Sequence, residues 1–148
     1  MRKLVAEVVE RGGDLIIYPL ARAESGVLLA DRPVLRVPRE SPRERIGDIV
    51  RRALDMATEG VPHPGLAEHR RRLNEFLGAV GVRKWSTFVR GARMTFIREE
   101  DAEIVFIPTL NRAREGFQHL PDSAVRIPSS SDSTAIGEAL ATALGRSS

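Results

Sequence analysis

Residues 15–54 read LIIYPLARAESGVLLADRPVLRVPRESPRERIGDIVRRAL, and residues 104–144 read IVFIPTLNRAREGFQHLPDSAVRIPSSSDSTAIGEALATAL. One inserted residue in the second stretch brings prolines, glycines and arginines of both into register. The matched pairs are Pro19 and Pro108, Gly26 and Gly116, Arg36 and Arg126, Pro38 and Pro128, and Gly47 and Gly137. Proline and glycine mark special backbone geometries, so their matched spacing indicates two similar halves.

Each copy is preceded by a second apolar segment, which predicts that each half begins with a β-hairpin. Val5–Val9 leads through Gly12–Gly13 into the first copy, and Met94–Arg98 leads through Glu99–Ala102 into the second. The two adjacent glycines provide the positive φ angles that a tight hairpin turn needs. The polar residues of the second segment predict a turn at the same place.

The first strand inside each copy is an unbroken apolar run, Leu15–Tyr18 or Ile104–Ile107. Such runs are typical of strands that are buried on both faces. Because proline cannot donate a hydrogen bond to a strand ladder, we expect these strands to end at Pro19 and Pro108.

A third strand and a helix complete each half. Val34–Val37 and Ala124–Ile127 are short β-branched segments that end at proline. Before the first helix, Ser41 and Glu44 have the spacing of a capping box. The candidates for capping the second helix are Ser131, Asp132 and Ser133.

The two helices share an apolar face and an internal glycine. Ile46 and Ile136 occupy the same point of the apolar face, and Gly47 and Gly137 follow them. Glycine inside a helix costs about 1 kcal/mol relative to alanine. Its presence in both copies predicts that the helix closely approaches the sheet or its partner helix.

These patterns predict an α/β protein in the broad sense that includes α+β. It would have duplicated strand-strand-strand-helix halves and a mixed or antiparallel sheet with packed helices. We expect one domain over residues 1–148, built from repeats at about 1–58 and 84–145. A helical linker at about 59–83 would join them, with an amphipathic helix over 66–79, and Gly145–Ser148 would be a frayed tail.

Composition limits the classes of function. The chain has 23 Lys and Arg against 20 Asp and Glu, a net charge of +3 that is small for a dedicated nucleic-acid binder. It has no cysteine, so disulfides, thiolate metal sites and thiol nucleophiles are excluded. No apolar run reaches the roughly 18 residues that a membrane span needs. We therefore expect a cytoplasmic protein that does not bind membranes.

No catalytic motif emerges from the sequence. His63, His69 and His119 do not have a metal-ligand spacing, and no glycine-rich phosphate loop is present. We expect no enzyme activity, cofactor or metal. The basic run Arg70–Arg72 is more typical of a solvated helix face than of a phosphate site, so nucleic acid is an unlikely partner.

Two strings carry a resemblance to a known family. One is WSTFVRGA at residues 85–92, followed by a hairpin and IVFIP, and the other is the helix IGEALATAL at 136–144. They resemble the immunity proteins of contact-dependent growth inhibition systems, of the CdiI type. The resemblance implies a cytoplasmic protein that binds and neutralises the cognate toxin domain of its own system. Such toxins are often nucleases.

A basic nuclease cleft would attract acidic groups, so the partner-binding residues are sought first on the predicted second hairpin turn and then on the loop one strand further on. They are Glu99, Glu100, Asp101, Arg112, Arg114 and Glu115. Two alternatives stay open. One is a small nucleic-acid-binding or scaffold module, and the other is a small enzyme with an unrecognised site.

Overall fold

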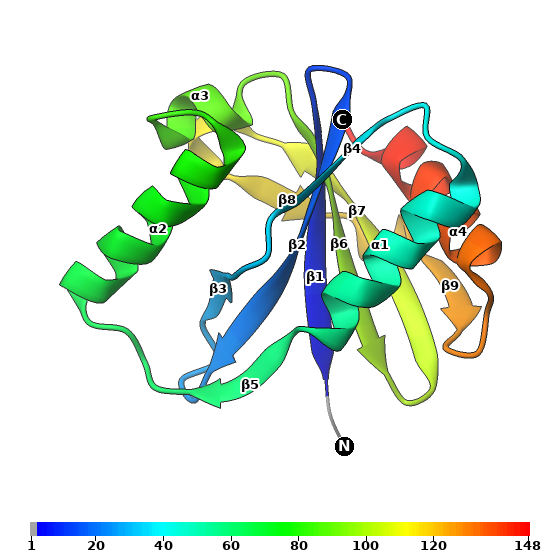
Figure 1. Ribbon diagram of the computed structural model, residues 1–148, viewed down its shortest axis with the longest axis horizontal. Coiled ribbons are helices and arrows are strands. Elements are labelled where there is room, and N and C mark those ends of the chain that lie inside the picture. The colour runs from blue at the N-terminus through cyan, green and yellow to red at the C-terminus, as the bar shows by residue number, and fades with distance from the viewer. Residues whose placement is uncertain (1–2) are drawn as a thin grey trace.

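A computed structural model describes residues 3–148. Nine strands form one curled sheet, with helices on both faces (Figure 1). The strands are β1 (Leu4–Arg11), β2 (Asp14–Ala23), β3 (Leu28–Ala30), β4 (Leu35–Pro38), β5 (Thr58–Val61), β6 (Arg93–Glu100), β7 (Glu103–Asn111), β8 (Phe117–His119) and β9 (Val125–Pro128). The helices are α1 (Arg43–Asp55), α2 (Leu66–Val80), α3 (Trp85–Val89) and α4 (Ser133–Arg146). Short 3-10 turns cover Ala113–Glu115 and Pro121–Ser123.

The order of elements repeats along the chain. Four strands and a helix, β1 to β4 and α1, are followed after β5, α2 and α3 by β6 to β9 and α4. The strand order β3-β2-β1-β6-β7-β8 places β1 beside β6 at the centre, where Ala6 pairs with Ile97. Neighbours along this order are antiparallel, whereas β5 joins β2 in parallel. The expected α+β class is confirmed, and the proposed repeat boundaries stay a prediction.

The central strands do not end at their prolines, contrary to expectation. β2 runs through Pro19 and β7 runs through Pro108. On its outer side, β2 pairs with β4 before Pro19 and with β3 after it, and β7 changes from β9 to β8 at Pro108 in the same way. The missing N–H therefore falls between two partners, where it breaks no ladder bond. The proline carbonyls still accept hydrogen bonds: Pro19 O accepts from Asp31 N at 3.0 Å, and Pro108 O accepts from Leu120 N at 2.8 Å.

Each face of the sheet has its own core because successive side chains of a strand point to opposite faces. Ile17 and Ile97 belong to the core under α1 and α4, whereas Ile16 and Val9 belong to the core under α2 and α3. In Figure 1, α1 and α4 lie side by side on one side of the molecule and α2 and α3 on the other. Burial on both faces of β2 and β7 is confirmed.

The ends of the helices differ from expectation in one copy. Asp132 caps α4 by accepting from Ala135 N at 2.8 Å, as one of the predicted candidates. The capping box at α1 is absent, because Pro42 occupies the N-cap position and no side chain caps the helix. The proline ring fixes a φ angle that suits the start of a helix, so α1 begins without a capping hydrogen bond from the Ser41 side chain.

The C-terminal segment is ordered rather than frayed. Helix α4 continues to Arg146, and Ser147 is buried, with its hydroxyl donating to Met94 O at 3.0 Å. Ser148 then pairs with β7, since its backbone N donates to Thr109 O at 3.0 Å and its O accepts from Asn111 N at 2.6 Å. The Ser147 hydroxyl and the Ser148 backbone thus form hydrogen bonds with backbone groups of β6 and β7, and these bonds hold the segment in place.

Candidate functional site

The predicted acidic turn is divided between structural and exposed carboxylates. Glu99, at the end of β6, accepts from both terminal nitrogens of Arg51 on α1, one of them at 2.8 Å. These hydrogen bonds hold the pKa of the Glu99 carboxyl below its usual range, against the opposing effect of desolvation. Arg51 also reaches Asp55, at 3.1 Å. Glu99 therefore links the sheet to α1, and it is not a free surface charge.

The other two acids of the turn are less constrained. Glu100 lies 3.5 Å from the Lys3 amine and 3.9 Å from Arg98 Nε. Asp101 is exposed at the tip of the turn and has no ion-pair partner among residues 3–148. Its φ is 55° and that of Ala102 is 63°, so both turn residues are left-handed, as are Gly12 and Gly13 in the first hairpin.

The loop bearing Arg112, Arg114 and Glu115 lies at the opposite end of β7. That strand has nine residues, so at roughly 3.3 Å per residue about 26 Å separate the loop from the acidic turn. The turn and the loop therefore do not share one edge of the molecule. Within the loop, Arg112 Nε lies 3.3 Å from Glu115, whereas the exposed Arg114 has no ion-pair partner in the described part of the chain.

A groove of about 670 Å³ joins this loop to α3. Trp85, Val89 and Arg90 line it from the α3 side, and Asn111 and Arg114 line it from the β7 side. Asn111 fixes the two sides relative to one another, because its side-chain amide donates to Val89 O at 2.7 Å and to Ala92 O at 2.9 Å. Its side-chain oxygen accepts from Ala113 N at 2.9 Å, which anchors the start of the loop.

Trp85 is the exposed end of a row of aromatic rings. Tyr18 on the sheet contacts Phe76 of α2 at 4.6 Å between ring centroids, and Phe76 contacts Phe88 of α3 at 5.3 Å. Phe88 contacts Trp85 at 5.3 Å. Phe88 is fully buried, whereas Trp85 is 43% exposed. The row holds the indole in place while leaving part of it open to solvent at the groove.

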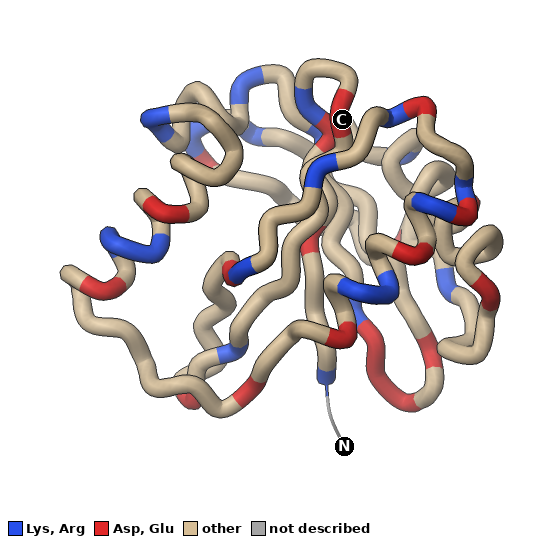
Figure 2. The backbone as a smooth tube through the Cα atoms, viewed as in Figure 1, with Lys and Arg blue, Asp and Glu red and all other residues tan. Residues whose placement is uncertain are grey.

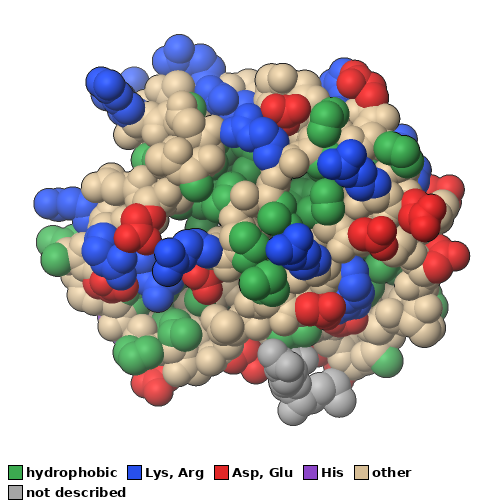
Figure 3. Space-filling model, in the orientation of Figure 1, with side chains coloured by type: hydrophobic (Ala, Val, Ile, Leu, Met, Phe, Trp, Pro, Cys, Tyr) green, Lys and Arg blue, Asp and Glu red, His purple; other side chains and the backbone are tan. Residues whose placement is uncertain are grey.

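The surroundings of the groove are basic. Residues 76–98 contain five Lys and Arg and no Asp or Glu. Of these five, Arg83, Lys84 and Arg90 are exposed, and within residues 3–148 none of the three has an ion-pair partner. Blue segments lie beside α3 in Figure 2, and Figure 3 shows Lys and Arg side chains gathered on that side.

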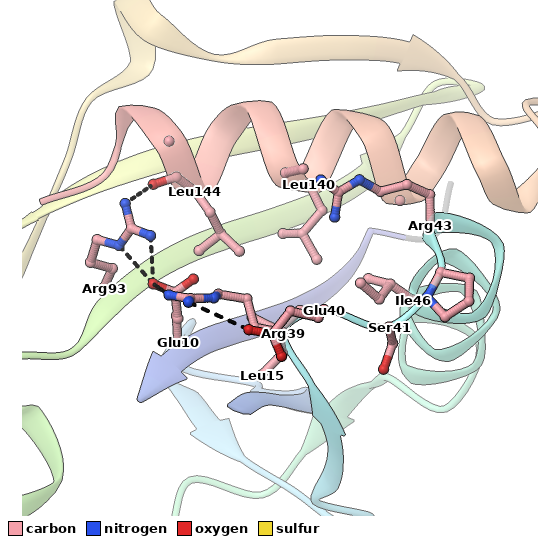
Figure 4. A pocket seen from close by; sticks show the side chains of 14 residues that line it. Glu10, Leu15, Arg39, Glu40, Ser41, Arg43, Ile46, Arg93, Leu140 and Leu144 are labelled. Atoms are coloured by element: carbon pink, nitrogen blue, oxygen red, sulfur yellow. Dashed lines mark hydrogen bonds and ion pairs between the residues drawn. The ribbon is translucent and has the colours of Figure 1, made fainter. Parts of the chain in front are cut away.

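A second cavity, of about 580 Å³, lies between the β1–β2 hairpin and α4 (Figure 4). Arg93 crosses it, donating through Nε to Glu10 at 3.0 Å and through Nη1 to Leu144 O at 3.1 Å. Arg39 Nη1 also lies 3.9 Å from Glu10. Glu10 and the two arginines thus largely satisfy one another, and the contacts brace α4 against the hairpin.

A third cavity, of about 420 Å³, lies beneath α2 and is lined by the half-buried acid Glu7. The Tyr18 hydroxyl donates to Glu7 at 2.8 Å. Burial raises the pKa of the Glu7 carboxyl, and burial together with the neighbouring Glu7 raises the pKa of Tyr18. Glu7 lies on the same face of β1 as Val5 and Val9, which belong to the core under α2.

No metal-binding cluster of three or more His, Cys, Asp or Glu side chains is present in the described chain. His63 Nδ1 lies 2.6 Å from Ser25 Oγ, and His119 packs against Phe96 with ring centroids 4.8 Å apart. Burial lowers the pKa of His119. None of the helices over residues 3–148 has the length and apolar character of a membrane span.

Comparison with known proteins supplies the family context. The family model of CDI immunity proteins, CdiI, matches residues 65–147, more than half of the chain. No curated protein matches. A chain of the CdiA-CT/CdiI toxin and immunity complex from Yersinia pseudotuberculosis is 14% identical with a TM-score of 0.84, covering 100% of this chain and 99% of that chain. A protein of unknown function from Neisseria meningitidis is 17% identical with a TM-score of 0.82, covering 99% and 96%. At these identities the two structures show a shared fold.

Proposed function

The chain belongs to the family of CDI immunity proteins, and from this membership we propose that it binds and neutralises the cognate toxin domain of a contact-dependent growth inhibition system. The family match over residues 65–147 is the observation that carries the proposal. The protein would act in the cytoplasm, by occupying the toxin and not by chemistry of its own. The proposed role therefore needs no catalytic residues in this chain.

The surface proposed to meet the toxin includes the loop residues Arg112, Arg114 and Glu115. They lie at or next to the groove lined by Trp85 and Arg90. The turn residues Glu100 and Asp101 form a second proposed contact, at the far end of β7. Glu99 would support that turn through Arg51 and would not bind the toxin directly.

The experiment uses the toxin domain encoded next to this chain. We expect the two proteins to co-purify when co-expressed, and we expect cells that express the toxin domain to grow only when this chain is present. A toxin domain from an unrelated system serves as the control and should neither bind nor be neutralised. Failure to bind the cognate domain, together with failure to protect, would exclude the proposed function.

The activity of the toxin is proposed to be that of a nuclease. Incubating the purified toxin domain with cellular RNA and with DNA tests this, and adding this chain in equimolar amount should stop any cleavage. A toxin domain that leaves both nucleic acids intact while still binding this chain would exclude the nuclease and retain the immunity function.

A further inference from the structure

We propose that the groove between α3 and the β7–β8 loop, residues 111–116, binds an acidic segment of the toxin that carries an apolar side chain. The inference rests on the proposed immunity function and adds the place and the chemistry of contact. It reverses the expected polarity, since the immunity protein would present positive charge and the toxin negative charge at this contact.

The first argument is unsatisfied positive charge at the groove. Arg90 and Arg114 line it from opposite sides, and both are exposed. Arg83 and Lys84 directly precede α3 and Trp85. None of these four cations has an ion-pair partner among the described residues, whereas the arginines on α2 at positions 71 and 72 are paired with Glu68.

The second argument is that nearby acids are already engaged. Glu10 is bound by Arg93, which also lines the groove, and Glu115 is paired with Arg112. The stretch 76–98 contributes no acid of its own. The rim therefore has a surplus of positive charge that carboxylates of a partner would neutralise. Complementary charge of this kind accelerates association and fixes orientation.

The third argument is a prepared apolar anchor. Trp85 is 43% exposed, yet its ring is held against the buried Phe88. Val89 and Ala92, both largely buried, line the groove beside it. Tryptophan and arginine are the residue types most enriched where interfaces derive most of their affinity. A side chain already held in place loses little conformational entropy on binding.

The groove suits a protein segment better than a nucleic-acid strand. A strand of bases is usually bound along a charged channel by several aromatic side chains in succession. This groove offers a single exposed aromatic ring, with its cations around an apolar floor. The net charge of +3 is also modest for a protein that binds phosphates over a long surface.

The test compares two double charge reversals with the wild-type chain. The groove variant is Arg90→Glu/Arg114→Glu, and the control is Arg45→Glu/Arg52→Glu on α1, which changes the net charge equally at exposed positions. Melting temperatures establish that each variant is folded. The dissociation constant for the cognate toxin domain is then measured at two salt concentrations.

We expect the groove variant to bind the toxin domain at least about tenfold more weakly, with a smaller dependence on salt. The control should stay within about twofold of wild type. If the wild-type chain binds and the groove variant binds equally well, the groove proposal fails while the immunity function stands. If the wild-type chain does not bind, both fail. The groove variant could lose binding to a 20-nucleotide single-stranded RNA that the wild-type chain binds, while its binding to the toxin stays intact. That result would assign the groove to nucleic acid and overturn the proposal.

A second measurement uses the fact that Trp85 is the single tryptophan of the chain. Labelling this chain with 5-fluorotryptophan gives one ¹⁹F resonance that belongs to the groove. Adding unlabelled toxin domain should shift or broaden it, because the exposed indole becomes covered. An unchanged resonance at saturating toxin would overturn the proposal, whatever the charge variants do.

Discussion

Gly47 of α1 lies directly against the backbone carbonyl of Ser133 at the start of α4. A Cβ atom at position 47 would be 1.7 Å from that oxygen. The relationship is reciprocal, because a Cβ at Gly137 of α4 would be 2.1 Å from the carbonyl oxygen of Arg43 at the start of α1. Since Arg43 and Ser133 occupy equivalent places four residues before the two glycines, the helices cross about a local two-fold relationship.

The crossing predicts that Gly47→Ala and Gly137→Ala each destabilise the fold. Overpacking against backbone, which cannot rotate aside, should cost about 3 kcal/mol or more in free energy of unfolding. Urea denaturation measures this change in the free energy of unfolding. Gly78→Ala in α2 is the matched control, because nothing lies within 4 Å of its Cβ position, and it should gain about 0.5–1 kcal/mol. Equal effects at all three positions would refute the close crossing.

The second hairpin turn contains a strained residue. Ala102 has a φ of 63°, a left-handed conformation that costs an L-residue with a Cβ about 1 kcal/mol. We predict that Ala102→Gly stabilises the protein by about 0.5–1 kcal/mol in thermal or urea unfolding. In the first hairpin, Gly13→Ala should have the opposite effect, since Gly13 has a φ of 84°. A loss of stability on Ala102→Gly would contradict this account.

Glu99 is predicted to make stability depend on acid pH. Its folded-state pKa is lowered, chiefly by the hydrogen bonds from Arg51. A lowered pKa means that the contribution is present above the unfolded-state pKa and is lost as pH falls through the folded-state value. Glu99→Gln should therefore cost about 1–2 kcal/mol at pH 7, with the difference from wild type shrinking toward pH 3. A difference that stays constant over this range would contradict the role of the ion pair.

Glu7 is predicted to have the opposite pH dependence. Burial raises its folded-state pKa, so the protonated form is favoured in the folded chain. Its contribution is complete below the unfolded-state pKa and is lost as pH rises through the raised value. The stability of wild type relative to Glu7→Gln should therefore fall between pH 4 and pH 8. Urea midpoints measured across that range would refute the prediction if the difference rose or stayed level.

The apolar periodicity predicted the helix faces, the apolar segments around polar turns predicted the hairpins, and the matched glycines predicted the close approach at Gly47 and Gly137, because each of these patterns reflects local structure. What they missed depends on pairing partners. The short strands β3, β5 and β8 have three or four residues each and gain their structure from pairing with β2 or β7. Ser147 is held by hydrogen bonds to Met94 and Ala143, which no pattern near the end of the chain indicates.

The candidate site was predicted only in part for the same reason. Arg114 was selected from the sequence, and it lines the groove. Its neighbour across the groove is Arg90, which lies in the resemblance string but far away along the chain, so spacing could not join them. Glu99 was placed on the predicted turn, and nothing in the turn sequence indicates that it binds Arg51, which is 48 residues distant. Sequence patterns identify such residues more readily than they identify the distant residues that these contact in the fold.

The acidic turn gives the last prediction, in a form that separates binding from stability. Reversing all three acids would also break the contact between Glu99 and Arg51 and lower the melting temperature, so only Glu100 and Asp101 are changed. Glu100→Lys/Asp101→Lys changes two exposed or half-exposed charges and should alter the free energy of unfolding by less than about 1 kcal/mol. If the turn faces a basic toxin surface, this variant should associate more slowly at low salt, since complementary charge mainly affects the association rate. Stopped-flow association kinetics with the cognate toxin domain measure the effect, with Arg45→Glu/Arg52→Glu as the comparison. An unchanged association rate would remove the turn from the interface and leave the basic groove at Trp85, about 26 Å away along β7, as the contact.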